Sequence, residues 1–447
     1  MVKMKILIKN GRLIDPANKI DDQIDILVDN GIVSQVTNNI DEALASGEDD
    51  TIIDASGLYV CPGFIDLRVH FREPGYEHKE TIRSGSRAAA RGGFTTVCTM
   101  PKTKPAMDSE ERIREAIEKA KEVTDINVLP VGAITASDEG QYITDFAGMK
   151  EAGAVAVCED GNSIMDARIA RQALKQAAEV DIPVFAHCED RNLMARGVMN
   201  AGEKAKQLGL YGILDAVEET MVARDILLAK DTKAKLHICH LSTKTAVDMV
   251  KQAKDLGLNV TAEVTPQHLI LTEDDVDGSD ANYKSAPPFR KKEDRDALIK
   301  GLRLGIIDAI ASDHSPHHYS EKAEGFVEAP FGLSMLETSI SLVMTELVQK
   351  GLLTPVQMVD RMSVRPAKII GLDRGNLKAG KVADITIIDP KASYVIDSNM
   401  FASKGKNTPF EGKKVNGKVL YTIVNGRIIY SNKDGNEIII DKDILRD

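Results

Sequence analysis

The 447-residue chain contains no tryptophan, and aromatic residues make up only 4% of it. Its hydrophobic core must therefore be built mainly from aliphatic side chains. No uncharged apolar run approaches the roughly 18 residues that a membrane span needs. The N-terminal sequence also lacks the apolar segment and the small-residue cleavage site of a secretion signal. The sequence thus predicts neither membrane insertion nor export.

Cysteine and positive charge are also scarce. The five cysteines are an odd number and include no CxxC pair, which argues against a disulfide framework and favours a reducing cytoplasm. The 68 acidic residues outnumber the 57 lysines and arginines, so the net charge is −11. Such a surface repels phosphate backbones and disfavours general nucleic-acid binding, while a local basic pocket can still bind a small anion.

From about residue 61 the sequence alternates short β-rich runs with helical patterns. The strands predicted in this way lie at 64–71, 94–100, 126–132, 154–159, 182–188, 235–241, 259–264 and 308–313. Parallel strands that are buried on both faces read as nearly continuous apolar runs, and eight strand–helix units in series can close into a barrel. We therefore predict an α/β fold, a TIM-like (β/α)8 barrel, over residues 61–369.

The two ends of the chain, residues 1–60 and 370–447, have a different pattern. They contain short β-like runs with four Asn-Gly pairs, at Asn10–Gly11, Asn30–Gly31, Asn416–Gly417 and Asn425–Gly426. Asn-Gly is the pair most typical of tight β-hairpin turns. We expect the two ends to combine into one small composite β-domain beside the barrel.

Ionisable side chains collect where the predicted strands end, which in such a barrel is the catalytic mouth. Asp160, His187, His240 and Asp313 end four different strands, and two imidazoles with two carboxylates suit a cation such as Zn²⁺. His70 ends the first strand, but taken alone it is better explained as a hydrogen-bonded core residue than as a ligand. The alternative for the whole set is a polar network that caps the barrel, which is disfavoured because burying ionisable groups without a cation is costly.

Motifs along the whole chain resemble those of dihydroorotases of the long bacterial type, in the metal-dependent amidohydrolase superfamily. The similarity opens with LIKNGRLIDP and continues through CPGFIDLRVHFREPGYEHKETIRSGSRAAARGGFTTV, FAHCED, HICHLST, TAEVTPQHL, ASDHSPH and EAPFGL, closing with GNLKAGKVADITIID. The resemblance implies the reversible hydrolysis of dihydroorotate to N-carbamoyl-L-aspartate in pyrimidine synthesis. It also implies a barrel with a composite β-domain, and a homodimer.

The resemblance further implies roles for individual residues. The implied metal ligands are His70, Asp160, His187, His240 and Asp313. Asp160 would bridge two metals, and Asp313 would also carry the catalytic proton. The implied contacts to the anionic substrate come from His70, Arg72, His317, Phe331 and Gly332.

Three positions depart from the family pattern: Arg68 replaces the first metal-ligating histidine, and Lys102 and Ala286 replace substrate-binding asparagines. A guanidinium cannot ligate a metal and would occupy the space of one ion. We therefore predict one zinc ion, held by Asp160 with His187 and His240, and no second ion. Arg68 should pair with Asp313 or Asp160.

These departures leave three interpretations. The favoured one is a dihydroorotase-type enzyme that retains one zinc and acts on a small anionic substrate. The second is a non-catalytic relative that serves as an assembly partner, for example of aspartate transcarbamoylase. The third is another cyclic-amide hydrolase, similar to hydantoinase or allantoinase, which is less favoured because Asp160 stands where those relatives have a lysine able to be carboxylated.

Overall fold

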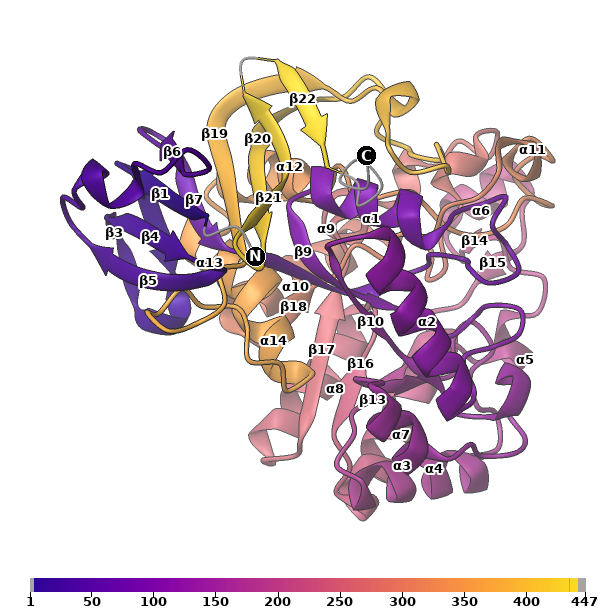
Figure 1. The fold of residues 1–447 in the computed structure, drawn as a ribbon. Coiled ribbons are helices and arrows are strands. Elements are labelled where there is room, and N and C mark those ends of the chain that lie inside the picture. Colours follow the sequence, from indigo (N-terminus) through magenta and orange to yellow (C-terminus); the bar gives the residue numbers. More distant parts are fainter. Residues whose placement is uncertain (1–3, 434, 441–447) are drawn as a thin grey trace.

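The structure is a computed structural model that describes residues 4–433 and 435–440. Its barrel strands alternate along the chain with helices that cover them (Figure 1). The strands are β8 (Phe64–Val69), β9 (Phe94–Thr99), β10 (Asn127–Pro130) with its continuation β11 (Gly132–Ala133), β12 (Val157–Cys158), β13 (Val184–Ala186), β16 (Leu236–Ile238), β17 (Val260–Val264) and β18 (Ala309–Ile310). Neighbours pair in parallel in the order of the chain, as the predicted α/β barrel requires.

The barrel closes where its first strand meets the segment after its last. Val69 and His314 form a parallel β-bridge, and the backbone amide of His70 donates to the His314 carbonyl at 2.8 Å. Nearer the start of the same strand, the backbone amide of Ser312 donates a hydrogen bond to the side-chain carboxylate of Asp66 at 3.1 Å. We refer to these contacts together as the seam of the barrel.

Each predicted strand is followed by a helix, as the alternation of β-rich and helical patterns predicts. The main helices are α1 (Ile82–Arg91), α2 (Glu110–Val123), α3 (Phe146–Ala152), α4 (Ala167–Glu179), α7 (Ala216–Thr232), α8 (Lys244–Asp255), α10 (Lys292–Leu304) and α12 (Ser339–Val343). α13 (Pro355–Val359) and α14 (Arg365–Ile369) follow them. Several helices begin at side-chain caps of the kind that Ser, Thr and Asp favour, such as Thr81, Ser109 and Asp166.

Three connections at the mouth contain short elements that the sequence does not predict. Between β13 and α7 lie α5 (Arg191–Met194), β14 (Met199–Asn200), α6 (Glu203–Leu208) and β15 (Gly212–Ile213). After β17 comes α9 (Pro266–Ile270), and after β18 comes α11 (Tyr319–Lys322). No helix in the described part of the chain is long and apolar enough to cross a membrane.

The two ends of the chain form two sheets beside the barrel (Figure 1). A four-stranded sheet, in the order β5-β4-β1-β6, contains β1 (Lys5–Lys9), β4 (Asp25–Asp29), β5 (Ile32–Thr37) and β6 (Thr51–Asp54). A seven-stranded sheet, in the order β22-β21-β20-β19-β7-β2-β3, contains β2 (Arg12–Asp15), β3 (Ile20–Gln23), β7 (Tyr59–Pro62), β19 (Ile385–Val395), β20 (Lys414–Val424), β21 (Arg427–Lys433) and β22 (Asn436–Ile439). Antiparallel pairing of β7 with β19 joins the two ends, which confirms the composite β-domain, while the boundaries near residues 60 and 370 stay a prediction.

The Asn-Gly pairs do not all have the predicted role. Asn30–Gly31 and Asn425–Gly426 have positive φ at both residues and connect the antiparallel pairs β4–β5 and β20–β21, as expected of hairpin turns. Asn416–Gly417 instead lies inside β20, so the prediction of a turn there is wrong. An added Cβ at Gly417 would lie 2.7 Å from Cγ of Met344, so this glycine allows the strand to pack closely on the barrel.

Candidate active site at the barrel mouth

Arg68 lies at the centre of the barrel mouth. It stands next to last in β8, and its side chain is only 3% exposed. Its Nε donates to Oδ1 of Asp313 at 3.0 Å, and its Nη2 donates to Oδ1 of Asp160. Nη2 also lies 3.5 Å from Nδ1 of His187. The prediction that Arg68 pairs with one of the two aspartates is confirmed, and the guanidinium in fact bridges both.

The structure brings the five predicted ligand residues together around this guanidinium. They come from the ends of five strands, and each is at most 8% exposed. Nδ1 of His70 lies 3.6 Å from Oδ2 of Asp160, and its Nε2 lies 3.8 Å from Oδ1 of Asp313. Nδ1 of His187 and Nε2 of His240 are 2.8 Å apart and form a hydrogen bond. The convergence is the one expected of a barrel mouth.

Two of these residues have a strained backbone. His240 has φ of 34° and Asp313 has φ of 51°, although neither is glycine. Non-glycine residues in this left-handed region cost energy and persist only where the surrounding structure holds them. Although positive φ also occurs at non-glycine residues elsewhere, at the ends of β16 and β18 it coincides with the convergence of ionisable side chains, which is consistent with a functional site.

The same residues do not fit a metal ion while Arg68 is among them. Within residues 4–433 and 435–440, no three His, Cys, Asp or Glu side chains are arranged so that they could hold one. The hydrogen bond between His187 and His240 uses ring nitrogens that a metal would need. The guanidinium also occupies one oxygen of each aspartate and would repel a divalent cation at short range.

Charges in the cluster are fixed by burial and by Arg68. Burial by itself would raise the pKa of Asp160 and of Asp313. For Asp160 the Arg68 guanidinium, and for Asp313 the adjacent His70 imidazole followed by Arg68, outweigh burial and hold both pKa values below their usual range. Burial, reinforced by the Arg68 charge, lowers the pKa of His187 to about 4 and that of His240 well below its usual value. At neutral pH the aspartates are therefore ionised and the imidazoles neutral.

The predicted substrate-binding residues line a cavity of about 400 Å³ in front of this cluster. Arg72 contacts the Pro316 carbonyl and Nε2 of His317, each at 3.4 Å. Nε2 of His317 also lies 2.9 Å from the Phe331 carbonyl, and its Nδ1 lies 3.4 Å from Nζ of Lys79. Both ring nitrogens of His317 thus have protein partners, which makes it the link between Arg72 and the loop that carries Phe331.

Gly332 completes this wall of the cavity. Its φ is 131°, and a Cβ added to it would lie 2.6 Å from Cβ of Ser315. Only glycine can adopt this backbone without strain and allow so close an approach. Gly332 therefore lies at the pocket, as predicted, and no larger side chain fits at its position.

Lys102 and Ala286, the two other departures, also line the cavity. Nζ of Lys102 is directed at Gly161, where an added Cβ would lie only 2.2 Å from it. The Lys102 charge contributes to lowering the pKa of Asp160 and, after burial and Arg68, that of His187. Lys102 therefore adds a cation beside the one that Arg68 supplies.

Other residues of the cavity were missed in the sequence. Glu189 lines it and follows His187 by two residues, and burial raises its pKa. Lys79 lines it from the loop after β8 and pairs with Glu321 at 2.8 Å. The signal for Glu189 was its place in the FAHCED motif, whereas the Lys79–Glu321 pair joins two loops and leaves no local pattern.

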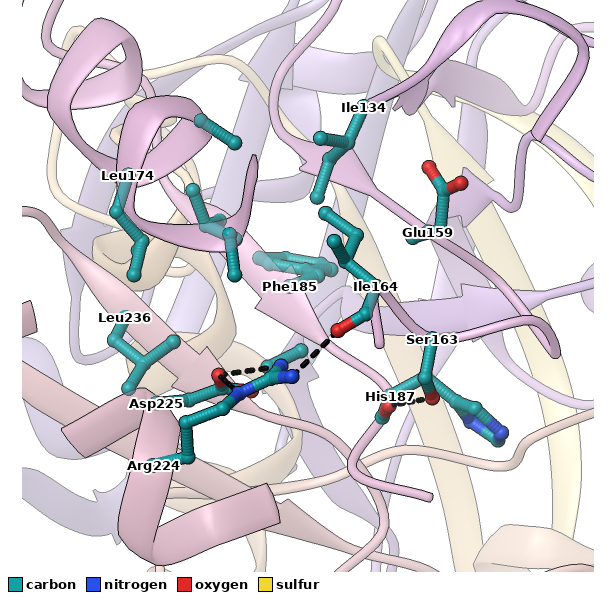
Figure 2. Close-up of a pocket in the computed structure, with 14 residues that line it drawn as sticks. Ile134, Glu159, Ser163, Ile164, Leu174, Phe185, His187, Arg224, Asp225 and Leu236 are labelled. Carbon is teal, nitrogen blue, oxygen red and sulfur yellow. Dashed lines mark hydrogen bonds and ion pairs between the residues drawn. The ribbon is translucent and has the colours of Figure 1, made fainter. Parts of the chain in front are cut away.

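The support behind His187 is shown in Figure 2. Ser163 donates from Oγ to the His187 carbonyl at 2.5 Å, and Arg224 pairs with Asp225 at 2.8 Å while reaching the Ile164 carbonyl. The space between these residues is only about 30 Å³ and is lined mainly by apolar side chains such as Phe185. It is therefore packing behind the strand and not a second substrate site.

A buried carboxylate holds the loop after His240. Glu218 accepts hydrogen bonds from the backbone amides of Ser242 and Thr243, each at 3.0 Å. Arg290, itself buried, donates from Nε to Oγ of Ser242 at 3.1 Å. No local sequence pattern predicts this network, because its members come from three separate segments.

Comparison with known proteins identifies the family of the chain. Residues 57–246 match the family described as dihydro-orotase-like. The chain is 46% identical over 421 residues to the proteins named dihydroorotase from Geobacillus sp. (strain WCH70) and Bacillus cereus (strain AH820), which covers 94% of this chain and 97% of each relative. Among solved structures it resembles L-hydantoinase (dihydropyrimidinase) from Arthrobacter aurescens, with a TM-score of 0.86, 26% identity and 98% of both chains covered.

A second solved structure, D-hydantoinase (dihydropyrimidinase) from Thermus sp., has a TM-score of 0.84 at 26% identity and covers 97% of both chains. The hydantoinases thus share the fold of this chain, while the dihydroorotases share far more of its sequence. This difference disfavours the hydantoinase-like interpretation. The chain belongs to the dihydroorotase family of cyclic amidohydrolases.

Proposed function

We propose that this protein interconverts dihydroorotate and N-carbamoyl-L-aspartate at the barrel mouth, as a step of pyrimidine synthesis. The observation that carries the proposal is that Asp313 and Arg72 face one cavity in a chain that is 46% identical to proteins named dihydroorotase. The cavity is of the size typical of small-molecule sites, and its cations suit a substrate with carboxylate groups.

In this proposal Arg72 binds the substrate carboxylate through its planar guanidinium. Asp313 accepts a proton from the water molecule that attacks the ring amide carbon, and it returns that proton to the ring nitrogen as the C–N bond breaks. The reverse sequence closes the ring and releases water. The low pKa of Asp313 beside Arg68 makes it a weak base, so we expect slow turnover.

Zinc, which the sequence predicts, has no assigned step here. Arg68 bridges the two aspartates, and His187 bonds His240, so the predicted ligands are engaged with one another. The test is an assay of dihydroorotate hydrolysis and of the reverse reaction, with and without added zinc. Turnover that is lost in Asp313→Asn supports the proposal, and equal rates with protein and with buffer would overturn it. Hydantoin and allantoin serve as competing substrates.

A second candidate function is favoured by Arg68 itself. A guanidinium held by two buried carboxylates is what a family member that has lost catalysis would retain as a structural element. Such a protein would act as an assembly partner, for example of aspartate transcarbamoylase. Sedimentation of the protein alone and mixed with aspartate transcarbamoylase tests this. If the two proteins sediment together as a complex and no turnover is detected, the second candidate function is supported. If the two proteins sediment separately, it is contradicted.

A further inference from the structure

We propose that Arg68 takes the place of a divalent ion as the resident cation of this site, so that the cavity binds a small dicarboxylate without any metal. The choice of ligand rests on the proposed function, whereas the independence from metal rests on the geometry of Arg68 alone.

The first step concerns the charges inside the cluster. Asp160 and Asp313 are buried, and ionised carboxylates in such a place need a partner of opposite charge. In the part of the chain that the structure describes, Arg68 is the lysine or arginine that forms ion pairs with them, and it reaches both. A guanidinium keeps its charge at any pH at which proteins fold. The pair of carboxylates is therefore already neutralised in part, and no metal is needed for that purpose.

The second step concerns the cations that face the cavity. Arg72 contacts a carbonyl and an imidazole, and neither of these is an anion. Lys102 lines the same cavity, and its charge acts on the carboxylates of Asp160 and Glu189 without forming a salt bridge among the described residues. Arg72 and Lys102 form no ion pair among the described residues, although the carboxylate of Glu189 lines the same cavity. Two such cations match a ligand with two negative groups, since each would gain a charged hydrogen bond. Lys79, which is paired with Glu321, is not available in the same way.

The third step concerns a polar atom without a partner. Nδ1 of His70 is buried and makes no hydrogen bond with any described residue, since Oδ2 of Asp160 lies 3.6 Å away. His70 also lines the cavity. Buried polar atoms in proteins nearly always have a partner, which is often a ligand or a water molecule when no protein group is present. A buried ring nitrogen without a hydrogen-bond partner is suited to a polar group of the ligand, such as the carbamoyl group of N-carbamoyl-L-aspartate.

The experiment is a calorimetric titration of N-carbamoyl-L-aspartate into the full chain, once after exhaustive treatment with EDTA and once with added zinc. We expect the two dissociation constants to agree within about twofold, because the binding cations are side chains. Lys102→Met should weaken binding about tenfold, the effect of losing one charged hydrogen bond. Lys119→Met, which removes an exposed lysine of α2, is the matched control and should leave binding unchanged.

Binding that disappears in EDTA and returns with zinc would overturn the inference, and so would the absence of binding in both conditions. If Lys102→Met and Lys119→Met bind N-carbamoyl-L-aspartate with equal affinity, Lys102 does not contact the ligand. Turnover is measured in the same samples, which separates this inference from the proposed function. If both turnover and binding require zinc, the proposed function is supported and the inference of metal-independent binding is wrong. If binding occurs without metal but no turnover is detected, the inference is supported and the proposed function is wrong.

Discussion

Replacing Arg68 by histidine tests the role of the guanidinium directly. The side chains of Arg68, Asp160 and Asp313 are 3%, 2% and 10% exposed, so the substitution leaves two buried carboxylates without their cation. Removing one partner of a buried ion pair costs about 3–5 kcal/mol of the free energy of unfolding. In EDTA we expect Arg68→His to be less stable than the wild type by about this amount.

Zinc should reverse this loss, because the substitution adds an imidazole beside two carboxylates that are no longer engaged. An ion present at about a thousand times its dissociation constant contributes about 4 kcal/mol, which is similar to the loss. Denaturant unfolding in EDTA and in zinc measures the stability, and elemental analysis measures the metal bound. We expect more zinc per chain and faster dihydroorotate hydrolysis than in the wild type.

Arg68→Met is the matched control for this experiment, since it removes the cation without adding a ligand. It should lose stability in EDTA to a similar extent and recover little of it in zinc. Equal stability of the wild type and both variants in EDTA would refute the reasoning about the buried ion pair. Equal zinc content in the wild type and Arg68→His would show that Arg68 does not lie in a metal position.

Three further predictions concern other residues. Asp313→Asn should lower kcat for dihydroorotate by at least about a hundredfold, the usual contribution of a general base; a change of less than about threefold would exclude that role. Burial lowers the pKa of His268 to about 4, so this imidazole stays neutral in the folded protein but is protonated in the unfolded chain below about pH 6.5. Its contribution to stability is therefore lost as the pH falls from about 6.5 to 4, and His268→Gln should reduce the fall seen in denaturant unfolding at those two pH values; an unchanged fall would contradict this. Gly332→Ala should raise KM, because the added Cβ meets Ser315, whereas Gly351→Ala shares the strain of a positive φ but has open space and should leave KM unchanged; equal KM values for the two variants would count against the contact.

The barrel could be predicted from the sequence because each strand is locally encoded. FIDLRV of β8 is buried at every position, and its apolar residues on both faces of the strand predict that it is covered on both sides. The insertion between β13 and α7 could not be predicted in the same way. β14 and β15 have two residues each, too short to show a period, and they form through pairing with each other.

The residues of the site could be predicted from the sequence, but most of the hydrogen bonds between them could not. The ends of parallel strands meet at one face, so the approach of His70, Asp160 and Asp313 follows from the fold. The bridging position of Arg68 follows from charge, because a buried guanidinium is expected to pair with the buried carboxylates nearest to it, those of Asp160 and Asp313. The bond between His187 and His240 could not be predicted, since it depends on side-chain rotamers that the sequence does not reveal. The same holds for Lys79 and Glu321, which are joined only by the folded loops.

The seam of the barrel ties the completion of the fold to the completion of the site. Asp66 and Ser312 are 246 positions apart, and their contact lies next to those of Arg68 with Asp313 and of His70 with His314. A growing chain that ends before this last segment has the first aspartate and the arginine but neither the second carboxylate nor the wall formed by Gly332. Binding of a dicarboxylate therefore requires the complete barrel, and we expect no such binding by a fragment that ends before the eighth strand.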